Sequence, residues 1–499
     1  MVSKNRVRST SLPSCSNSIP PPSSPANPHS FQPSQFDALK PIHIAGTKGK
    51  GSTSAFISSI LSQYLSSPSP APKKVALYTS PHLRFVRERI QINNEPISEE
   101  KFAQYFFEVW DRLEAAAQES GVPTDAPTKP VYFRYLTLMA LHAYLKEGVD
   151  SAVIECGIGG EYDSTNILVH PTITAITSLG IDHVAMLGNT LPEIAWHKAG
   201  IMKAGSLAFT APQKEEALKV LQNRANEKGV ELHVVDVHPQ LDNGEVKIGL
   251  SASYQKINAS LAIAVAAAHL RKLGVEGIPD PTTTPSIPLP EQFVRGLETV
   301  KWAGRCDVRK EKDIIWNIDG GHTLDSIEVT GRWFADRIAE QRAGSHQAPR
   351  ILIFNQQTRD ANALARALYT ALQTGMSTSS SSTTNDSTTT QSSPFTHAIF
   401  TTNQTFSTGY SPDLVSLNTN QADVDTLAVQ KALAETWRSI DGKAEVRVMR
   451  TVEESVEYAR GVGREWREKG GEVEVMALVT GSLHLVGGVI DVLERGKGE

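Results

Sequence analysis

The sequence predicts an α/β protein of two domains, each built around a mainly parallel β-sheet. From residue 41 onward, short β-branched runs alternate with longer segments of helical periodicity, which is typical of βαβ units. Five prolines within residues 279–290 interrupt this alternation, because proline prevents regular backbone hydrogen bonding. The chain has 499 residues, 40% of them hydrophobic, which is enough for more than one core.

The first domain is predicted to span residues 37–300. Its predicted strands are short, and the helical segments between them are long enough to return the chain to the same end of the sheet. The predicted strands cover residues 42–45, 75–79, 152–155, 172–177, 206–210 and 231–235, and the predicted helices cover residues 99–117, 132–146, 214–228 and 257–273.

The second domain is predicted to span residues 301–499 and to be a Rossmann-like α/β domain. Residues 377–393 carry one charge and no large apolar side chain, so we expect a disordered insertion there. The predicted strands cover residues 313–318, 350–354, 395–402, 445–449 and 473–479, and the predicted helices cover residues 323–339, 360–372, 426–439 and 452–469.

Residues 1–36 are predicted to form a disordered tail, because they are rich in serine and proline and contain no acidic residue. Their basic, acid-poor composition also resembles a mitochondrial transit peptide, although prolines between residues 20 and 28 interrupt any amphipathic helix. A plain tail is the favoured interpretation. We therefore expect a cytoplasmic protein that is also a candidate for the mitochondrion.

The overall charge and composition favour small-molecule substrates. Lysine and arginine total 49 against 54 acidic residues, a net charge of -5, which gives no reason to expect binding to nucleic acid or anionic lipid. The most apolar helical stretch, residues 259–268, is about half the length of a membrane span. Three cysteines without a CxxC pair predict neither disulfides nor structural zinc. We expect a soluble monomer.

A glycine-rich segment, residues 43–53, follows the first predicted strand and opens a helix. Its glycines allow the backbone to curl around an anion, the helix N-terminus supplies positive potential, and Lys50 can reach the outer phosphates. The spacing departs from the strict motif, because Ala45 stands at the first glycine position and Gly51 separates Lys50 from Ser52. We predict a P-loop-type ATPase domain that binds a nucleoside triphosphate; a turn with solvated lysines is the alternative.

Polar residues follow three predicted strands at ends that a parallel sheet brings together. They are Ser80, Glu155 and the pair Asp182 and His183. Oxygen ligands with an occasional imidazole suit Mg²⁺. We therefore predict a Mg²⁺ site at this edge, with a monovalent cation such as K⁺ as a further candidate. Each residue taken alone is also compatible with a helix cap or a turn.

Several segments resemble the folylpolyglutamate synthase family, within the Mur ligase superfamily. They occur in the family's order from about residue 41 to the C-terminus, which makes the resemblance more specific than any one motif. Residues 354–360 are close to fungal members, so we expect a eukaryotic, fungal-like protein. The matching segments are residues 43–53, 78–83, 87–90, 155–160, 163–166, 180–183, 187–190, 194–201, 319–323 and 479–487.

The sequence departs from the family pattern in a few places. Before Pro41 there is little of the helical segment that the family normally carries ahead of the phosphate loop, so we expect the usual N-terminal layer to be missing. Ala303 replaces a proline and Gly321 replaces an alanine. Neither replacement removes a functional group.

The resemblance implies an ATP-dependent ligase that adds L-glutamate to the γ-carboxylate of tetrahydrofolate and its polyglutamates. The family first converts the carboxylate to an acyl phosphate, which the amine of glutamate then attacks. ATP, L-glutamate and reduced folates would be the small-molecule partners. Positioning and electrostatic stabilisation can supply most of such a barrier.

The resemblance also implies roles for individual residues in this sequence. Lys50, Lys198 and His183 would be the catalytic residues. The ATP phosphates and nucleotide would be held by Gly49, Lys50, Gly51, Ser52, Arg305 and Asp319, magnesium by Ser80, Glu155 and His183, and glutamate by His322 and Ser482.

Lys198 matches a family lysine that is carbamylated. An ammonium about 4 Å from a unit positive charge costs about 4 kcal/mol at an effective dielectric constant of 20, and a divalent ion increases that cost. A carbamate reverses the repulsion because it is an anion. A solvated lysine on a helix face is the alternative.

The flat rings of a folate call for aromatic side chains near a loop. Phe85, Tyr132 and Tyr135 are the candidates, with Arg87 or Arg134 steering the anionic tail. An aromatic stripe at helical spacing is, however, more often part of a core.

Three other functions remain open at this point. A dihydrofolate synthase would use the same machinery on dihydropteroate, but Lys48 and His82 favour the polyglutamate enzyme. A Mur-type ligase of cell-wall precursors is disfavoured by residues 79–90. A degenerate nucleotide-binding protein is disfavoured because Lys50, Glu155, His183 and Lys198 are all present.

Overall fold

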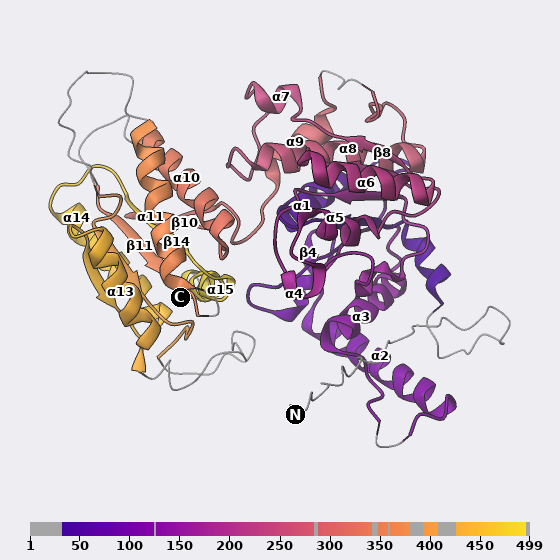
Figure 1. Ribbon diagram of the computed structural model, residues 1–499, viewed down its shortest axis with the longest axis horizontal. Coiled ribbons are helices and arrows are strands. Elements are labelled where there is room, and N and C mark those ends of the chain that lie inside the picture. The colour runs from indigo at the N-terminus through magenta and orange to yellow at the C-terminus, as the bar shows by residue number, and fades with distance from the viewer. Residues whose placement is uncertain are drawn as a thin grey trace, which may run out of the picture.

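The computed structural model describes residues 32–123, 126–283, 288–341, 348–357, 360–378, 393–407 and 426–495. These residues form two α/β domains that lie side by side (Figure 1). Residues 1–31 of the predicted tail and most of the predicted insertion 377–393 lie outside the described residues. The tail prediction also includes residues 33–36, but these belong to the 3₁₀ helix η1 (Pro33–Leu39), in which Phe36 is buried.

The first domain is built on an eight-stranded sheet with the order β4-β3-β2-β5-β1-β6-β7-β8. Strand β1 lies at its centre and pairs in parallel with β5 and β6, so that Ile42 is opposite both Val153 and Ile173. β3 and β4 add an antiparallel edge. The strands are β1 (Ile42–Ala45), β2 (Val75–Tyr78), β3 (Ile90–Ile92), β4 (Glu95–Pro96), β5 (Ser151–Glu155), β6 (Ile173–Ile176), β7 (Leu207–Thr210) and β8 (Glu231–Val234).

Helices cover both faces of this sheet, because successive side chains of a strand point to opposite sides. Val75 and Leu77 of β2 join the core under α1 (Lys50–Ser62), α8 (Gln255–Leu273) and α9 (Glu291–Thr299). Ala76 and Tyr78 join the core under η1, α2 (Glu99–Glu119) and α3 (Tyr132–Glu147). The remaining elements are η2 (Val86–Arg89), η3 (Ser164–Ile167), α4 (Val184–Leu187), α5 (Leu191–Ala199), α6 (Glu215–Lys228) and α7 (Pro239–Asp242).

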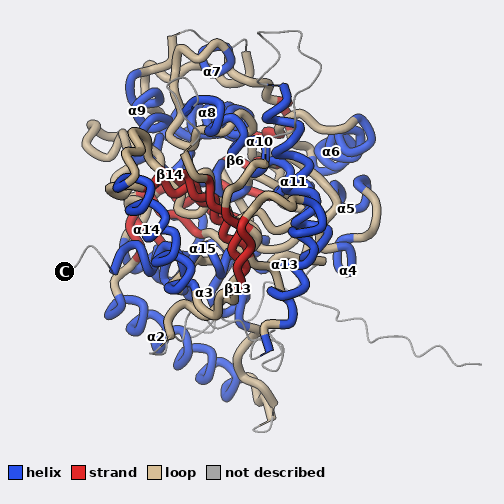
Figure 2. The backbone as a smooth tube through the Cα atoms, turned by 90° about the vertical axis from the view of Figure 1, so that its left-hand side faces the viewer, coloured by secondary structure: helices blue, strands red, loops and turns tan. Residues whose placement is uncertain are grey.

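The second domain contains a six-stranded sheet with the order β13-β12-β11-β14-β10-β9. All its pairs are parallel except β9 with β10. Figure 2 shows the strands in red between layers of helices. The strands are β9 (Asp307–Lys310), β10 (Ile314–Ile318), β11 (Arg350–Phe354), β12 (His397–Phe400), β13 (Glu445–Val448) and β14 (Val475–Thr480).

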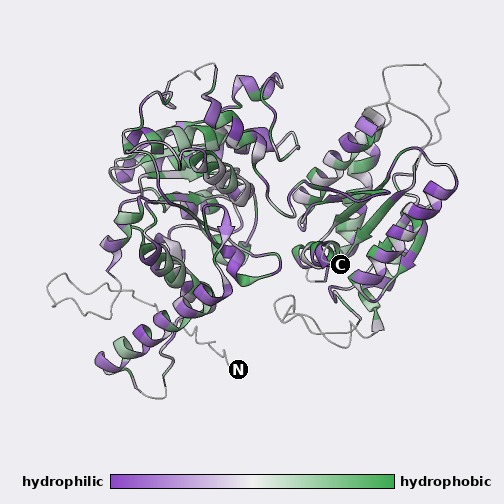
Figure 3. Ribbon diagram, turned by 180° about the vertical axis from the view of Figure 1, so that it is seen from behind, coloured by the Kyte–Doolittle hydropathy of each residue, from purple (hydrophilic) through white to green (hydrophobic). Residues whose placement is uncertain are grey.

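The helices of the second domain also divide between two faces. One core lies under α10 (Leu324–Gln341), α11 (Ala361–Thr378) and α13 (Ala428–Ile440), and the other lies under α14 (Val452–Glu468) and α15 (Leu483–Arg495). Hydrophobic residues accordingly follow the strands and the inner faces of the helices in both domains (Figure 3). None of the helices in the described part of the chain combines the length and apolar character needed to cross a membrane.

The predicted fold class, two α/β domains with mainly parallel sheets, is confirmed. Every predicted strand and long helix corresponds to an observed one within two residues at each end, except α11. Helix α11 continues to Thr378, six residues past its predicted end, so the predicted insertion begins too early at residue 377. The antiparallel strands β3, β4 and β9, and helix α15, were not predicted. The three strands have two to four residues each, which is too short for a periodic signal.

Candidate active site

The glycine-rich segment forms a tight loop between β1 and the N-terminus of α1. Gly46 and Gly49 have φ values of 150° and 88°. A Cβ atom at Gly46 would lie 1.8 Å from the Thr177 hydroxyl oxygen, and one at Gly49 would lie 2.2 Å from the Asn258 amide oxygen. Only glycine fits both positions. Helix α1 then begins at Lys50, so the loop presents a helix N-terminus, which favours anions.

A second loop, residues 177–183 after β6, lies directly against the phosphate loop. The backbone N–H groups of Thr47 and Lys48 both donate to the Ser178 carbonyl, at 3.1 and 3.0 Å. The Lys48 ammonium lies 3.6 Å from a carboxylate oxygen of Asp182. His183 follows Asp182, is exposed, and precedes α4 with φ 51°. The carboxyl ends of β1 and β6 are therefore brought together as predicted.

Glu155 ends β5 beside β1 and is 3% exposed. One of its carboxylate oxygens accepts a 3.2 Å hydrogen bond from the Ser80 backbone N–H. Burial raises the pKa of Glu155 to about 7, although the charges of Lys50, Arg305 and Arg89 favour the ionised form. The Glu155 carboxylate lies among positively charged side chains. It is suited to binding a metal ion that enters together with its own oxygen ligands.

Lys198 lies on α5 and is also 3% exposed. The helix starts with a capping box, in which Thr190 and Glu193 each bond the other's backbone. The Lys198 Nζ donates a 2.7 Å hydrogen bond to the Gly46 carbonyl of the phosphate loop. Burial, reinforced by the charge of Lys50, lowers the pKa of Lys198 to about 7. A substantial fraction of this amine is therefore neutral, and nucleophilic, near neutral pH.

The donor set at this edge fits Mg²⁺ in type. The structure brings the backbone of Ser80 within hydrogen-bonding distance of Glu155, and it places His183 on the loop that contacts the phosphate loop. Within the described residues, no group of three or more His, Cys, Asp or Glu side chains is arranged to hold a metal. Mg²⁺ in nucleotide sites is usually held by one or two carboxylates together with phosphate oxygens and water, so Glu155 with substrate oxygens meets that requirement.

The two candidate nucleotide-binding residues of the second domain, Arg305 and Asp319, differ in how far their charged groups are already engaged within that domain. Arg305 is the last residue of the linker into the second domain, and its charge acts on Glu155 of the first domain. Asp319 directly follows β10 and is buried. Its carboxylate accepts hydrogen bonds from donors of its own domain: Cys306 N at 3.0 Å, Gly321 N at 3.0 Å and Thr330 Oγ1 at 2.8 Å. Asp319 therefore shapes the turn after β10.

The two candidate glutamate residues also make local contacts. His322 Nδ1 lies 2.9 Å from the Gly320 carbonyl, and its backbone N–H donates to Ser326 Oγ. Ser482 precedes α15, and its Oγ accepts a 3.1 Å hydrogen bond from the Leu485 N–H. Both residues lie at the carboxyl edge of the second sheet, after β10 and β14 respectively.

The two domains meet across this region. The Lys48 ammonium donates a 2.9 Å hydrogen bond to the Thr323 hydroxyl of the second domain. A Cβ atom at Gly51, in the first turn of α1, would lie 3.2 Å from the indole nitrogen of Trp302. The phosphate loop is therefore adjacent to the linker at residues 302–305 and to the start of α10.

Known proteins that resemble this chain point to one family. No family model matches the sequence. The chain is 46% identical over 472 residues to a folylpolyglutamate synthase of Neurospora crassa, covering 93% of this chain and 83% of that protein. It is 43% identical over 472 residues to a folylpolyglutamate synthase of Saccharomyces cerevisiae, covering 93% and 79%. The chain belongs to the folylpolyglutamate synthase family.

A solved structure supports the same fold. Folylpolyglutamate synthase of Mycobacterium tuberculosis, complexed with ADP and AMPPCP, matches with a TM-score of 0.64 at 20% identity. The match covers 93% of this chain and 96% of that chain. The two-domain arrangement of this member of the folylpolyglutamate synthase family is thus shared with a distant homologue.

The predicted folate-contacting aromatics lie in different environments. Tyr132 is 60% exposed, and the Arg89 guanidinium lies 5.8 Å from its ring centroid. Phe85 is partly exposed between the guanidinium groups of Arg84 and Arg87. Tyr135 is buried, and its hydroxyl donates to the Phe106 carbonyl. Tyr135 therefore belongs to the core between α2 and α3, whereas Phe85 and Tyr132 face solvent.

Sequence reasoning missed Arg89 as a site residue. Its Nε donates a 2.9 Å hydrogen bond to His82 Nδ1, and its charge acts on both Glu155 and Tyr78. Residues 87–90 match the family pattern, but that match does not show which of the two arginines turns inward. The 3₁₀ helix η2 decides which arginine turns inward, because it points the side chains of Arg87 and Arg89 in different directions.

Proposed function

We propose that this chain is an ATP-dependent ligase that adds L-glutamate to the γ-carboxylate of tetrahydrofolate and its polyglutamates. The observation that carries the proposal is the convergence of a phosphate loop, a buried carboxylate and a buried lysine at one sheet edge. The charge of Lys50 acts there on both Glu155 and Lys198. Membership of the folylpolyglutamate synthase family supplies the substrate class.

Gly49, Lys50, Gly51 and Ser52 hold the phosphates of ATP in this proposal. The backbone N–H groups of the first turn of α1 point toward an anion at its N-terminus. Lys50 stabilises the charge on the outer phosphates, and Arg305 approaches from the second domain. Asp319 acts indirectly, because its hydrogen bonds fix the turn that carries His322.

Ser80, Glu155 and His183 are the residues that would hold Mg²⁺, with K⁺ as a further candidate cation. Bound Mg²⁺ neutralises negative charge on the phosphates. Glu155 would be held ionised by the bound cation, although burial alone favours its neutral form. His183 adds an exposed imidazole on the adjoining loop.

Lys198 is proposed to carry a carbamate. Its neutral amine attacks carbon dioxide, a carbon–nitrogen bond forms, and one proton is released to solvent. The product is an anion, which removes the repulsion between Lys198 and Lys50. The lowered pKa of Lys198 favours this reaction, since only the neutral amine is nucleophilic.

The reaction proceeds in two displacements. A folate γ-carboxylate oxygen attacks the γ-phosphorus of ATP, the bond from that phosphorus to the bridging oxygen breaks, and ADP leaves. The neutral amine of glutamate then attacks the acyl carbon, a carbon–nitrogen bond forms, and inorganic phosphate leaves while the amine loses a proton. Lys50 and Arg305 offset the charge that develops on the transferred group.

His322 and Ser482 are proposed to bind glutamate, and Phe85 and Tyr132 to line the folate site. Support for the folate residues comes from the exposure of Tyr132 and the partial exposure of Phe85. His322 is next to Thr323, which contacts Lys48 of the first domain, and Ser482 lies at the same edge of the second sheet. The acid-poor composition of residues 1–36 supports a mitochondrial form beside a cytoplasmic one. We propose that the enzyme acts as a monomer.

The test is a product assay with the purified chain. It is incubated with ATP, Mg²⁺ and L-glutamate, and with either tetrahydrofolate or dihydropteroate, and the products are identified by mass spectrometry. We expect tetrahydrofolate to gain successive glutamyl residues. Product from dihydropteroate alone would indicate a dihydrofolate synthase, and nucleotide binding without either product would contradict a ligase function.

A further inference from the structure

Residues 80–89, between β2 and β3, reach from the first domain onto the second; we call them the latch loop. Leu83 packs against the second-domain core under α15. A Cβ atom at Gly304 would lie 2.7 Å from Val486 of α15 and 3.2 Å from Leu83. These contacts show that Leu83 is inserted between α15 and the linker that carries Arg305.

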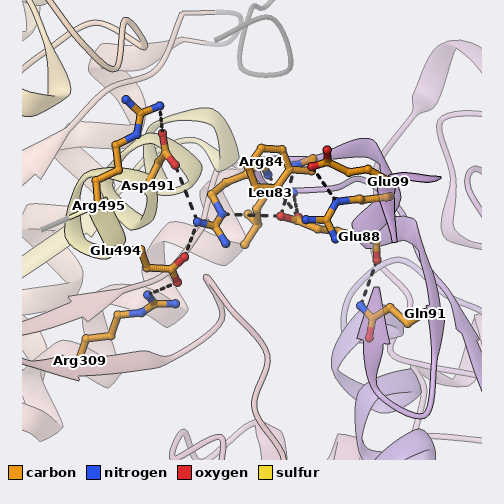
Figure 4. A network of polar contacts seen from close by, with 11 residues as sticks. Leu83, Arg84, Glu88, Gln91, Glu99, Arg309, Asp491, Glu494 and Arg495 are labelled. Carbon is orange, nitrogen blue, oxygen red and sulfur yellow. Dashed lines mark hydrogen bonds and ion pairs between the residues drawn. The ribbon is translucent and has the colours of Figure 1, made fainter. Parts of the chain in front are cut away.

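Arg84 adds an ionic contact at the same place (Figure 4). Its Nη1 is bonded to a carboxylate oxygen of Glu494 and lies 3.9 Å from Asp491, both on α15. Asp491 is in turn 3.4 Å from Arg495. The Arg84 side chain is 21% exposed, so solvent screens these contacts only in part.

The contacts continue from Arg84 into the second domain. The second oxygen of Glu494 accepts a 3.0 Å hydrogen bond from Arg309 Nη1. Arg309 Nε donates to Asp307 at 3.0 Å, and the same Asp307 oxygen lies 3.4 Å from the Gly304 N–H. A chain of polar contacts thus links the latch loop to the backbone next to Arg305.

The latch loop is also braced internally by Glu88. The Glu88 carboxylate accepts hydrogen bonds from the backbone N–H groups of Leu83 at 2.8 Å, Arg84 at 3.2 Å and Phe85 at 3.3 Å. At the start of the loop, the Ser80 N–H donates to Glu155. The latch loop therefore contacts α15 through Leu83 and Arg84, and Glu155 through Ser80.

We propose that Leu83 and Arg84 are positioning residues that dock the latch loop on α15 and thereby align Arg305 with the phosphate loop. The inference rests on the proposed ligase function, since alignment matters for transfer between groups held by different domains. Neither residue touches the reacting atoms. They act through the loop that carries Ser80 and through the linker that carries Arg305.

The kinetic test separates alignment from ATP binding. We expect Arg84→Ala to lower kcat about five-fold, the effect of losing one partly exposed ion pair. The Kd of ATP should change less than kcat does, because the phosphate loop of the first domain supplies most of the ATP contacts and Arg305 only one. Arg84→Lys should recover most of the lost kcat, as it keeps the charge. The matched control is Arg447→Ala, which removes a surface ion pair with Glu445 on β13 and should leave kcat unchanged.

A double-mutant cycle identifies the partner. If Arg84 acts through Glu494, the variant Arg84→Ala/Glu494→Gln should be no slower than the slower single variant. Leu83→Ala should lower kcat by roughly ten-fold, since it removes the apolar part of the docking contact. Additive losses in the ionic pair would contradict the coupling through Glu494.

Hydrogen exchange decides the docking without any turnover. Amides in residues 83–85 should exchange faster in Arg84→Ala than in the wild-type chain, with unchanged exchange in α1. Equal kcat and equal exchange in Arg84→Ala and wild type would overturn the inference while leaving ligase function in place. A wild-type chain without turnover would contradict the proposed function, and the exchange result would still decide the latch.

Discussion

The carboxyl edges of the two sheets hold their charged side chains in different ways. In the first domain, Glu155 and Lys198 are buried, and burial shifts the pKa of each to about 7. In the second domain, Asp319 is equally buried, but three donors of its own domain satisfy its carboxylate. Ser482 likewise caps its own helix.

This difference indicates a division of labour between the edges. The first edge keeps charges whose balance changes when a polyanion and its cation bind. The second edge keeps a fixed backbone shape, on which Arg305, His322 and Ser482 are presented. Burying Glu155 and Lys198 at the first edge therefore lowers the stability of the fold in favour of function. Burying the hydrogen-bonded Asp319 at the second edge instead contributes to stability.

The largest effect is expected from Lys50→Ala. Removing the ammonium that stabilises the transferred phosphoryl group should lower kcat/KM by about a thousand-fold or more. Thermal unfolding should change little, because Lys50 lies in the first turn of α1 and is partly exposed. Steady-state kinetics and calorimetry check both points. Activity within ten-fold of wild type would show that the phosphate loop is not the cradle.

Lys198→Arg tests whether the buried lysine acts as a carbamate. Arginine keeps the positive charge and cannot be carbamylated, so we expect kcat to fall by roughly a hundred-fold. In the wild-type chain, activity in carbonate-free buffer should rise on adding bicarbonate, and more steeply above pH 7, where the amine is mostly neutral. Heavy-carbon bicarbonate with carbon NMR detects the carbamate directly. A fully active Lys198→Arg variant would exclude that role.

Glu155→Gln separates function from stability at the first edge. The folded chain holds a proton on Glu155 between its ordinary pKa of 4.5 and about 7, so the free energy of unfolding falls as the pH rises through this window. Without Mg²⁺ and above pH 7, the variant should be more stable than wild type by up to roughly 3 kcal/mol. Below pH 4.5 the two should agree.

The measurement for Glu155→Gln is thermal unfolding with a chelator at both pH extremes. The same variant should lose about a hundred-fold in kcat, because it lacks the carboxylate for the cation. A variant that is less stable than wild type above pH 7 would indicate that Glu155 is favourably ionised in the folded chain.

The smallest effect on chemistry is expected from Asp319→Asn. An amide cannot accept from all three donors as a carboxylate does, so the free energy of unfolding should fall by about 1–3 kcal/mol. We expect kcat to fall less than ten-fold, because the side chain shapes a turn. Denaturant unfolding and kinetics measure the two effects. A loss of more than a hundred-fold in kcat at unchanged stability would instead place Asp319 in contact with the nucleotide.

Much of the fold could be predicted, because buried parallel strands and long helices carry strong periodic signals. The contact of the 177–183 loop with the phosphate loop, and that of Ser80 with Glu155, also followed from sheet topology. The orientation of Asp319 could not be predicted, since its donors, Cys306 and Thr330, come from different elements. Tyr135 looked available in sequence, but packing of α2 against α3 buries it.

The contacts between domains were beyond the reach of sequence patterns. Arg84 and Glu494 are 410 positions apart, and neither lies in a periodic pattern that distinguishes it from other surface charges. Helix η1 was missed for a related reason. It is a single short 3₁₀ segment, and it is held in place by the burial of Phe36 and Leu39 against α3.

The most direct test of the account is the fate of oxygen in the folate γ-carboxylate. The wild-type chain is incubated with ATP, Mg²⁺, L-glutamate and tetrahydropteroylglutamate carrying a heavy oxygen isotope in that carboxylate. Phosphoryl transfer at the N-terminus of α1 predicts that one labelled oxygen appears in the released inorganic phosphate. Unlabelled phosphate, with the oxygen lost from the folate carboxylate recovered in water, would contradict activation of the carboxylate at this site.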